Sequence, residues 1–308
     1  MRLPFEPAAL IRLAFDRRTW KAWWKALRPA SLVIALVSCG LGAALAWRDS
    51  RGDAVATILV LAAGMILQAG VNLVNDFFEF RQKRVDDKVA HLGFPREDRN
   101  LLEVLIFLVG LALFGLAGLI GLFLVWRTHW PLLVLGIVGF AGGFFYTGEP
   151  LNYKRRGLAV AIVFFLMGVM MVGGSYYGVT GGISWPVVWA SVPTSLLVSL
   201  ILLANELRDF ESDVRFRVRT LTVRIGYRRA IVVYCALLFL AYCGPMALRS
   251  AGIMPHVALV YLALPFAVPP FLFMRRPPER RNGIIPLVML HHLAYGALYC
   301  VSFLKGAS

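Results

Sequence analysis

Long apolar runs, rather than alternating apolar and polar positions, dominate the chain. The run from Leu101 to Trp126, LLEVLIFLVGLALFGLAGLIGLFLVW, contains a single charged residue. A bilayer core roughly 30 Å thick is crossed by about 20 apolar residues in a helix, and a chain in lipid satisfies its backbone groups only in helices or a closed barrel. The sequence lacks the short alternating segments of a barrel. The runs therefore predict membrane-spanning helices.

Nine such segments can be marked out along the sequence. They lie at about 30–47, 54–74, 101–126, 130–147, 158–179, 185–204, 230–247, 255–274 and 283–303. The composition agrees, since 59% of the residues are hydrophobic and 16% are charged, against roughly 45–50% and 25% in soluble domains. The predicted fold is an all-α integral membrane protein with nine transmembrane helices in a single bundle at 30–303.

The basic residues separate almost completely when successive loops are placed on alternate sides of the membrane. All but five of the 32 Lys and Arg residues fall on the side of the N-terminus. The five exceptions are Arg48, Arg51, Arg127, Arg249 and Lys305. Positive residues concentrate in cytoplasmic loops, so we expect a bacterial inner-membrane protein with a cytoplasmic N-terminus.

Residues 1–29 precede the first apolar segment and mix basic side chains with Trp20, Trp23 and Trp24. This pattern is typical of an amphipathic helix that lies on anionic lipid. The net charge of +15 is explained by the same attraction to the membrane surface. The sequence contains no recognisable soluble nucleic-acid-binding module, so the expected partner is the lipid bilayer and not nucleic acid.

Acidic residues gather in two clusters on the same predicted side, and each cluster directly follows an apolar segment. The second cluster is NELRDFESD, at 205–213. If the sixth helix continues past Asn205, then Asn205, Asp209 and Asp213 are spaced four residues apart and project from one helical face. That face would be polar and acidic.

The first cluster is NLVNDFFEFRQKRVDD, at 72–87. By the same helical spacing Asn75, Glu79 and Asp86 share a stripe, with Asp76 beside it. Like charges four residues apart destabilise a helix by a few tenths of a kcal/mol, so both stripes call for a counter-charge. Mg²⁺ takes oxygen ligands and commonly bridges carboxylates to substrate phosphates. Two facing stripes would therefore suit a Mg²⁺-bound diphosphate.

A simpler explanation is that these acids only neutralise nearby Arg and Lys side chains on a hydrated loop. Two similar clusters at one membrane face favour the metal site over that explanation. The loop YTGEPLNYKRRG supplies Tyr146, Lys154, Arg155 and Arg156 at the same face. Its ammonium and guanidinium groups could hold diphosphate oxygens, although positive-inside topology alone would also place them there.

Four motifs, in order over about residues 28–303, carry a resemblance to a known family. They are RPASL (28–32), NLVNDFFEF (72–80), FFYTGEP (144–150), and NELRDFESD with RTLTVRIG (205–213 and 219–226). With them the chain resembles the UbiA superfamily of integral-membrane prenyltransferases. The acidic motif at 205–213 is intact. In the acidic cluster at 72–87, Glu79 stands where the family usually has Asp, and Lys83 stands where some members have a third acid.

The resemblance implies a nine-helix bundle whose cytoplasmic loops cap a central cavity. It also implies a prenyltransferase that uses Mg²⁺, two ions in this family, to move a polyprenyl group from a polyprenyl diphosphate to an aromatic acceptor. The metal ligands it implies are Asp76, Glu79, Asp86, Asp209 and Asp213. The diphosphate-binding residues it implies are Asn75, Asn205, Lys154, Arg156 and Arg208. Tyr146 is expected to face the reacting carbon.

The form of the acidic motif at 205–213 favours 1,4-dihydroxy-2-naphthoate, the acceptor of menaquinone biosynthesis. The acceptors 4-hydroxybenzoate, homogentisate, a chlorin or a lipid headgroup would use the same diphosphate site. A membrane transporter is an alternative of another class, but its sites usually lie near the bilayer midplane, where this chain has almost no ionisable residues. A CDP-alcohol phosphotransferase is disfavoured because its Asp-Gly and Ala-Arg signature is absent.

Overall fold

The computed structural model describes residues 23–24, 26–82 and 99–304. Within these ranges every regular element is helical. The elements are α3 (Pro29–Arg48), α4 (Ala54–Gln82), α6 (Arg99–Arg127), α7 (Pro131–Phe144), α8 (Ala159–Val163), η2 (Phe164–Met170), α9 (Met171–Thr180), α10 (Trp185–Arg208), α11 (Phe210–Arg215), α12 (Leu221–Ile225), α13 (Tyr227–Ser250), α14 (Ala258–Tyr261), α15 (Leu264–Met274), η3 (Pro278–Gly283) and α16 (Ile284–Leu304). The predicted N-terminal arm lies mostly outside the described residues.

Long apolar helices dominate the described part of the chain, which confirms the predicted all-α membrane fold. Within the described residues, seven segments are long and apolar enough to cross a membrane, with α8, η2 and α9 counted as one segment and η3 and α16 as another. Two shorter apolar segments, Pro131–Phe144 and Ala258–Met274, occupy the positions of the remaining two predicted spans. The count of nine spans therefore stays a prediction, because the two shorter segments fall below the length of the others.

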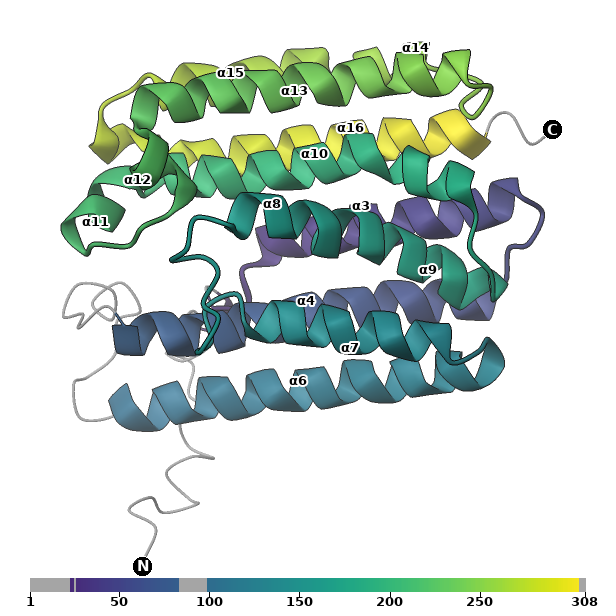
Figure 1. Ribbon diagram of the computed structural model, residues 1–308, viewed down its shortest axis with the longest axis horizontal. Helices are drawn as coiled ribbons and strands as arrows, with labels where there is room; N and C mark the ends of the chain where they lie inside the picture. The colour runs from purple at the N-terminus through teal and green to yellow at the C-terminus, as the bar shows by residue number, and fades with distance from the viewer. Residues whose placement is uncertain (1–22, 25, 83–98, 305–308) are drawn as a thin grey trace, which may run out of the picture.

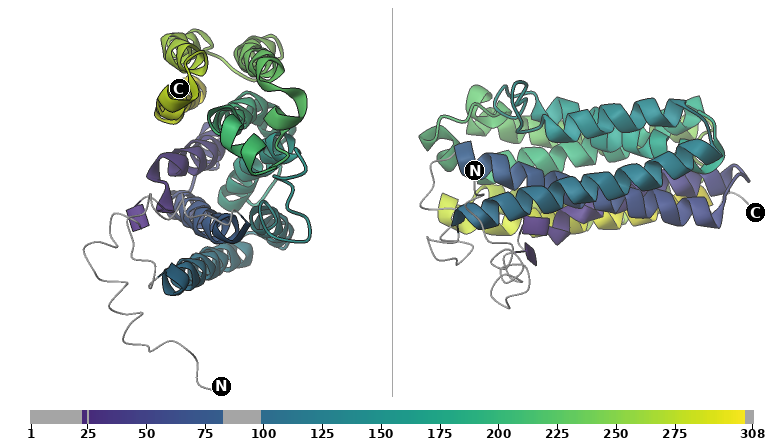
Figure 2. Two further views of the ribbon diagram at one scale, coloured as in Figure 1. Left: turned by 90° about the vertical axis from the view of Figure 1, so that its left-hand side faces the viewer. Right: turned by 90° about the horizontal axis from the view of Figure 1, so that it is seen from below.

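The helices run side by side with nearly parallel axes (Figures 1 and 2). Helix α10 lies at the centre of the bundle, with 72% of its apolar window buried, whereas only 22% is buried in the peripheral helix α6. Helices α13 and α15 lie on one side of α10, and α4, α7 and α6 on the other (Figure 1). The fully buried side chains of α10, such as Leu197, Leu200 and Leu203, form the middle of the main core.

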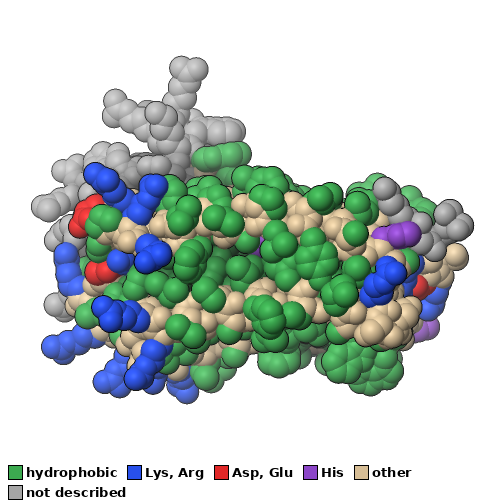
Figure 3. Space-filling view, turned by 90° about the horizontal axis from the view of Figure 1, so that it is seen from above, with side chains coloured by type: hydrophobic (Ala, Val, Ile, Leu, Met, Phe, Trp, Pro, Cys, Tyr) green, Lys and Arg blue, Asp and Glu red, His purple; other side chains and the backbone are tan. Residues whose placement is uncertain are grey.

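Charged side chains sit at the two ends of the bundle, and an apolar belt lies between them (Figure 3). On the visible face most Lys and Arg side chains gather at the end where α10 stops and α11 and α12 begin. The opposite end has exposed tryptophans, including Trp126, Trp130 and Trp185. Tryptophan is enriched at membrane–water interfaces, so this distribution is that of a membrane-embedded bundle with one strongly basic face.

The span predicted at 158–179 contains a π-helical stretch, η2, between α8 and α9. Such stretches are rare and occur often at functional sites. Here η2 packs directly on α10: a Cβ atom at Gly168 would lie 2.1 Å from Ser195 Oγ. A glycine at this position therefore allows the close approach of two membrane helices. Leu166, Met167 and Met170 of η2 line the cavity described next.

Candidate active site

A cavity of about 850 Å³ runs along the inside of the bundle. Its polar end lies at the basic end of the molecule and is lined by Asn75, Lys154, Asn205, Asp209 and Asp213. Apolar residues line the rest as far as Val60, Leu124 and Leu132 near the opposite end. Asn75 and Val60 belong to the same helix, and at 1.5 Å per residue their separation corresponds to about 22 Å along its axis. The cavity is thus long and apolar over most of its length, and it has one polar end.

The second acidic motif lines the polar end of this cavity almost as the sequence predicts. Helix α10 stops at Arg208 instead of continuing through the motif, and α11 begins at Phe210. Four-residue spacing nevertheless persists, because the Asp209 N–H donates to the Asn205 carbonyl at 3.0 Å and the Asp213 N–H donates to the Asp209 carbonyl at 2.8 Å. As a result all three predicted side chains line the cavity.

The first motif approaches the same end of the cavity from α4, which extends to Gln82, beyond the predicted end at residue 74. Asn75 lines the cavity, and its Oδ1 accepts a hydrogen bond from Thr147 Oγ1 at 2.9 Å. Asp76 forms an ion pair with Arg28, a residue that itself lines the cavity. Glu79 belongs to α4 by its backbone, its side chain is not among those described, and Asp86 lies outside the described residues.

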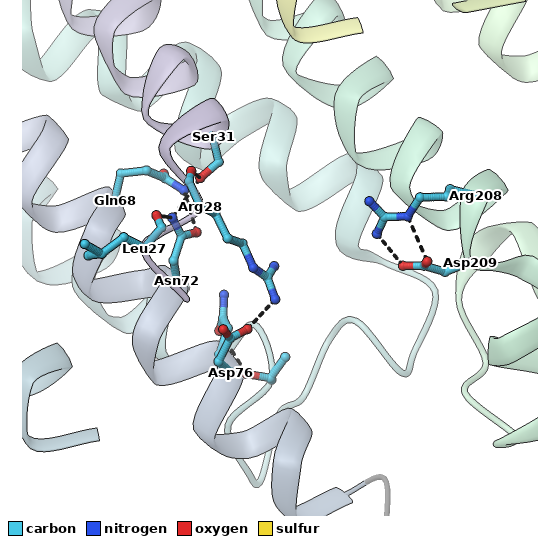
Figure 4. Close-up of polar contacts among 10 residues, drawn as sticks. Leu27, Arg28, Ser31, Gln68, Asn72, Asp76, Arg208 and Asp209 are labelled. Carbon is cyan, nitrogen blue, oxygen red and sulfur yellow. Dashed lines mark hydrogen bonds and ion pairs between the residues drawn. The ribbon is translucent and has the colours of Figure 1, made fainter. Parts of the chain in front are cut away.

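Two arginine–carboxylate pairs therefore flank the polar end of the cavity (Figure 4). On the α10 side, Arg208 Nε and Nη2 donate to the two carboxylate oxygens of Asp209 at 2.8 and 2.7 Å. On the α4 side lies the Arg28–Asp76 pair. Each side thus offers both a carboxylate and a guanidinium, the two groups that a metal-bound diphosphate requires.

The loop between α7 and α8 adds Tyr146, Tyr153 and Lys154 to the cavity wall. Lys154 Nζ lies 5.7 Å from the ring centroid of Tyr146. Tyr153 is buried and donates to the Gly142 carbonyl at 2.6 Å. Burial raises the pKa of the Tyr153 hydroxyl above its usual value, so the hydroxyl stays protonated and holds this loop against the end of α7.

The structure does not bring Arg156, another predicted diphosphate ligand, into the cavity. Its side chain is exposed and donates to the Pro150 carbonyl at 3.0 Å. Of the predicted diphosphate-binding residues, Asn75, Lys154, Asn205 and Arg208 do line the cavity. Tyr146, predicted to face the reacting carbon, lines it too.

Arg28, Glu206 and Gln68 also line the cavity, although they were not among the predicted site residues. Arg28 is the first residue of the RPASL motif, and its place in that motif could have marked it as a site residue. Glu206 is 4% exposed, and its Oε2 accepts hydrogen bonds from Thr222 N at 2.9 Å and Thr222 Oγ1 at 3.1 Å. An ionisable residue in the last turns of a span is a functional candidate by default. Gln68 shares a face of α4 with Asn72 and Asn75 by spacing.

The donor set at the polar end fits Mg²⁺. Its groups are carboxylate and amide oxygens, which Mg²⁺ prefers, and the ion usually takes only one or two protein carboxylates, with waters and substrate phosphates completing its shell. Among the described residues no three His, Cys, Asp or Glu side chains are close enough to hold a metal ion by themselves. Asp209 and Asp213 on one side of the cavity, and Asp76 on the other, would therefore each hold Mg²⁺ only together with a diphosphate.

The fold and the site together define an integral-membrane protein with a long apolar cavity that ends in carboxylates, amides and cations. Residues 35–293 match the UbiA prenyltransferase family, and the chain belongs to this family. The resemblance seen in the sequence motifs is thereby confirmed, and the protein is a prenyltransferase.

Relatives of named activity extend this comparison. The chain is 27% identical over 243 residues to the 1,4-dihydroxy-2-naphthoate octaprenyltransferase of Bacillus subtilis (strain 168), covering 79% of this chain and 78% of that protein. It is 32% identical over 257 residues to the Mycobacterium tuberculosis protein of the same name, covering 75% and 85% of the two chains. The solved structure of a UbiA homolog from Archaeoglobus fulgidus bound to GPP and Mg²⁺ has the same fold, with a TM-score of 0.60, 12% identity and coverage of 91% and 99%.

Proposed function

We propose that this protein transfers a polyprenyl group from a polyprenyl diphosphate to 1,4-dihydroxy-2-naphthoate, a step of menaquinone biosynthesis. The main support is the continuity of the cavity: the carboxylates, amides and cations of the polar end open directly onto an apolar chamber that extends to Val60 and Leu124. The diphosphate would bind at the polar end and the polyprenyl tail would lie in the chamber. The named activity of the relatives supports the choice of acceptor.

The residues at the polar end have separate tasks in this proposal. Asp76, Asp209 and Asp213 hold Mg²⁺, together with Glu79 and Asp86 of the first motif, and Asn75 and Asn205 orient the diphosphate. Lys154, Arg208 and Arg28 bind its oxygens, since each lines the cavity. The chemistry that bound Mg²⁺ supplies is neutralisation of the charge on the leaving diphosphate.

The reaction breaks the allylic carbon–oxygen bond of the donor and forms a carbon–carbon bond to the aromatic ring. As the first bond breaks, negative charge grows on the diphosphate, where Lys154 and Arg208 stabilise it. Positive charge grows on the allylic carbon, which the apolar chamber shields from water. Tyr146 lies at the polar end of the chamber, where its ring face can stabilise the developing cation. The ring carbon then attacks the allylic carbon, and the proton that this ring carbon loses passes to the released diphosphate.

The charge distribution supports one orientation of the protein in the membrane. The basic end of the bundle carries the diphosphate site, and positive residues mark the cytoplasmic side. We therefore place the active site on the cytoplasmic side of a bacterial inner membrane, with the N-terminus in the cytoplasm. Proteolysis of inside-out and right-side-out vesicles tests this orientation: the loop that carries the exposed Arg156 is cut only in inside-out vesicles if the placement is right.

The first experiment is a transfer assay with the detergent-purified protein. The protein is incubated with Mg²⁺, with donors from geranyl to longer polyprenyl diphosphates, and with 1,4-dihydroxy-2-naphthoate, 4-hydroxybenzoate or homogentisate, and product mass and released diphosphate are followed. We expect metal-dependent prenylated dihydroxynaphthoate, lost with EDTA and in Asp209→Asn. Product with another acceptor only would replace the proposed substrate. Absence of product and of donor binding would contradict the prenyl-transfer function itself.

A further inference from the structure

A chain of buried amides runs from the start of α3 into the cavity wall. Asn72 Nδ2 donates to the Leu27 carbonyl at 2.8 Å and to Ser31 Oγ at 2.7 Å. Ser31 Oγ in turn donates to the Arg28 carbonyl at 2.8 Å. At the other end of the chain, Gln68 Nε2 donates to Asn72 Oδ1 at 3.2 Å. Gln68, Asn72 and Ser31 all line the cavity (Figure 4).

The two backbone carbonyls fix the direction of every hydrogen bond in this chain. A carbonyl oxygen can only accept, so the Asn72 atom facing Leu27 must be its NH₂ group. Asn72 Oδ1 is then the acceptor, and the Gln68 atom that faces it must be Nε2. The amide assignment is therefore set by the network. The atom left over is Gln68 Oε1, an acceptor.

Gln68 Oε1 has no hydrogen-bond partner among the described residues, although Gln68 is only 4% exposed. A buried acceptor without a donor loses the hydrogen bonds that it would make to water and gains none in return, so such an atom needs a donor from a ligand. Because the atom accepts, the partner must bring an O–H or N–H group. Because Gln68 lines the cavity, a ligand in the cavity can bring it.

The position of Gln68 indicates which part of a ligand it meets. It lies seven residues before Asn75 on the same face of α4, two helical turns or about 10 Å deeper in the cavity. A diphosphate at Asn75 and Asp209 does not reach that depth. A polyprenyl tail is a hydrocarbon and has no O–H or N–H group that could donate a hydrogen bond. An aromatic acceptor that attacks the carbon next to the diphosphate must bind below the polar end, and this position brings a ring hydroxyl within reach of a side chain deeper in the cavity.

We infer that Gln68 binds the aromatic acceptor, with its Oε1 accepting a hydrogen bond from a ring hydroxyl. This inference rests on the prenyl transfer proposed above and adds the residue that selects hydroxylated acceptors. The hydrogen bond also draws the hydroxyl proton away from its oxygen, which increases electron donation into the ring and favours attack on the allylic carbon. Gln68 is thus a specificity residue for the acceptor and not part of the diphosphate site.

The test compares Gln68→Met with the unaltered protein on three acceptors. They are 1,4-dihydroxy-2-naphthoate and its two analogues lacking one hydroxyl, 1-hydroxy-2-naphthoate and 4-hydroxy-2-naphthoate. We expect the KM for the dihydroxy compound to rise about five- to tenfold in Gln68→Met, the loss that one hydrogen bond causes, with the KM for the donor unchanged. For the analogue that lacks the bonded hydroxyl, the variant and the unaltered protein should have the same KM, which isolates the contact.

Gln68→Asn is the second variant, in case Gln68→Met does not fold, because it keeps an amide but withdraws the oxygen by one methylene. The control is Ser38→Ala. Ser38 is also buried, on the neighbouring helix α3, and donates to the Met167 carbonyl at 2.7 Å, but Ser38 itself does not line the cavity. An equal rise in KM for all three acceptors, or none, would overturn the role of Gln68. A lack of product from the unaltered protein with every acceptor would instead remove the proposed function.

Discussion

Arg281 Nη1 donates to both carboxylate oxygens of Glu211, at 2.8 and 3.0 Å. Arg281 is only 8% exposed, its Nε donates to the Arg276 carbonyl at 2.9 Å, and its guanidinium lies 4.2 Å from the ring centroid of Tyr227. The contact joins α11 to η3. Helix α11 has six residues, too few for stability on its own, so this anchor holds it in place.

The anchor bears on the active site through the geometry of α11. Glu211 and Asp213 are two residues apart and so point to nearly opposite sides of the helix. Glu211 is exposed and bound by Arg281, while Asp213 is buried at the cavity. We predict that Arg281→Gln raises the KM for the Mg²⁺-diphosphate donor by about tenfold and lowers kcat, because small misplacements of a catalytic group are costly. Transfer rates measured across a Mg²⁺ titration check this.

Arg127→Gln is the matched control for this prediction. Arg127 Nη2 pairs with Asp53 at 2.9 Å, but the pair lies at the end of the bundle away from the active site. Its loss should lower stability slightly and leave the Mg²⁺ dependence unchanged. Conservative Arg281→Lys should recover part of the donor affinity. If Arg281→Gln changes thermal stability alone, Arg281 has no positioning role.

Lys154 and Arg156 differ in position although the sequence places them two residues apart. Lys154 lines the cavity, whereas Arg156 is exposed outside it. We predict that Lys154→Gln lowers kcat by about 100-fold, the scale for removing one charge-stabilising group. Arg156→Gln should stay within about twofold of the unaltered protein. Initial rates at saturating donor distinguish the two residues. A large loss of activity in both variants would show that Arg156 also acts at the diphosphate site.

Glu206 joins α10 to α12 through Thr222, and two substitutions separate this structural contact from its charge. Gln can still accept from the Thr222 N–H, so Glu206→Gln should fold with nearly unchanged stability. Glu206→Ala leaves that N–H buried without an acceptor and should cost about 1–3 kcal/mol. Thermal unfolding in detergent measures both. Equal destabilisation by the two substitutions would show that the negative charge, not the hydrogen bond, holds α12.

The helices could be predicted well from the sequence because lipid imposes a simple pattern. The apolar run predicted at 101–126 is helix Arg99–Arg127, and that predicted at 185–204 ends only four residues later, at Arg208. Where the prediction was incomplete, polar residues extend a helix beyond the bilayer. Helix α4 continues to Gln82 because hydrated helix ends have no apolar requirement, and apolar content alone therefore locates such ends poorly.

The site was predictable where one short stretch of sequence carries it, and less predictable where the fold brings together residues that are far apart in the sequence. Asn205, Asp209 and Asp213 follow a four-residue spacing that a sequence displays directly. Arg28 pairs with Asp76, which is 48 residues away in the sequence, and no local sequence pattern predicts such a pair. Arg156 lies outside the cavity although Lys154 lines it, because side chains two residues apart in a loop need not share a direction.

Asp53 shows how the end of the bundle away from the site responds to pH. Its Oδ1 accepts from the Ala56 N–H at 2.6 Å, capping α4, and Oδ2 accepts from Arg127 at 2.9 Å. The Arg127 guanidinium, followed by the Ala56 N–H, lowers the pKa of Asp53 below its usual value. A carboxyl group whose pKa is lower in the folded state stabilises the protein above its unfolded-state pKa, about 3.9, and this stabilisation is lost as the pH falls through the lower, folded-state pKa.

Asp53→Ala should therefore cost about 1 kcal/mol at pH 7, the usual value of a helix cap, and progressively less below about pH 4. Asp53→Asn keeps a capping oxygen and loses only the charge, so its cost should be smaller, because exposed ion pairs contribute little. Thermal unfolding in detergent from pH 7 to pH 3 measures both differences. Acid removes only the contribution of an ionised carboxylate. If the stability difference between Asp53→Ala and the unaltered protein stays constant over this range, the charge of Asp53 is not the origin of the effect.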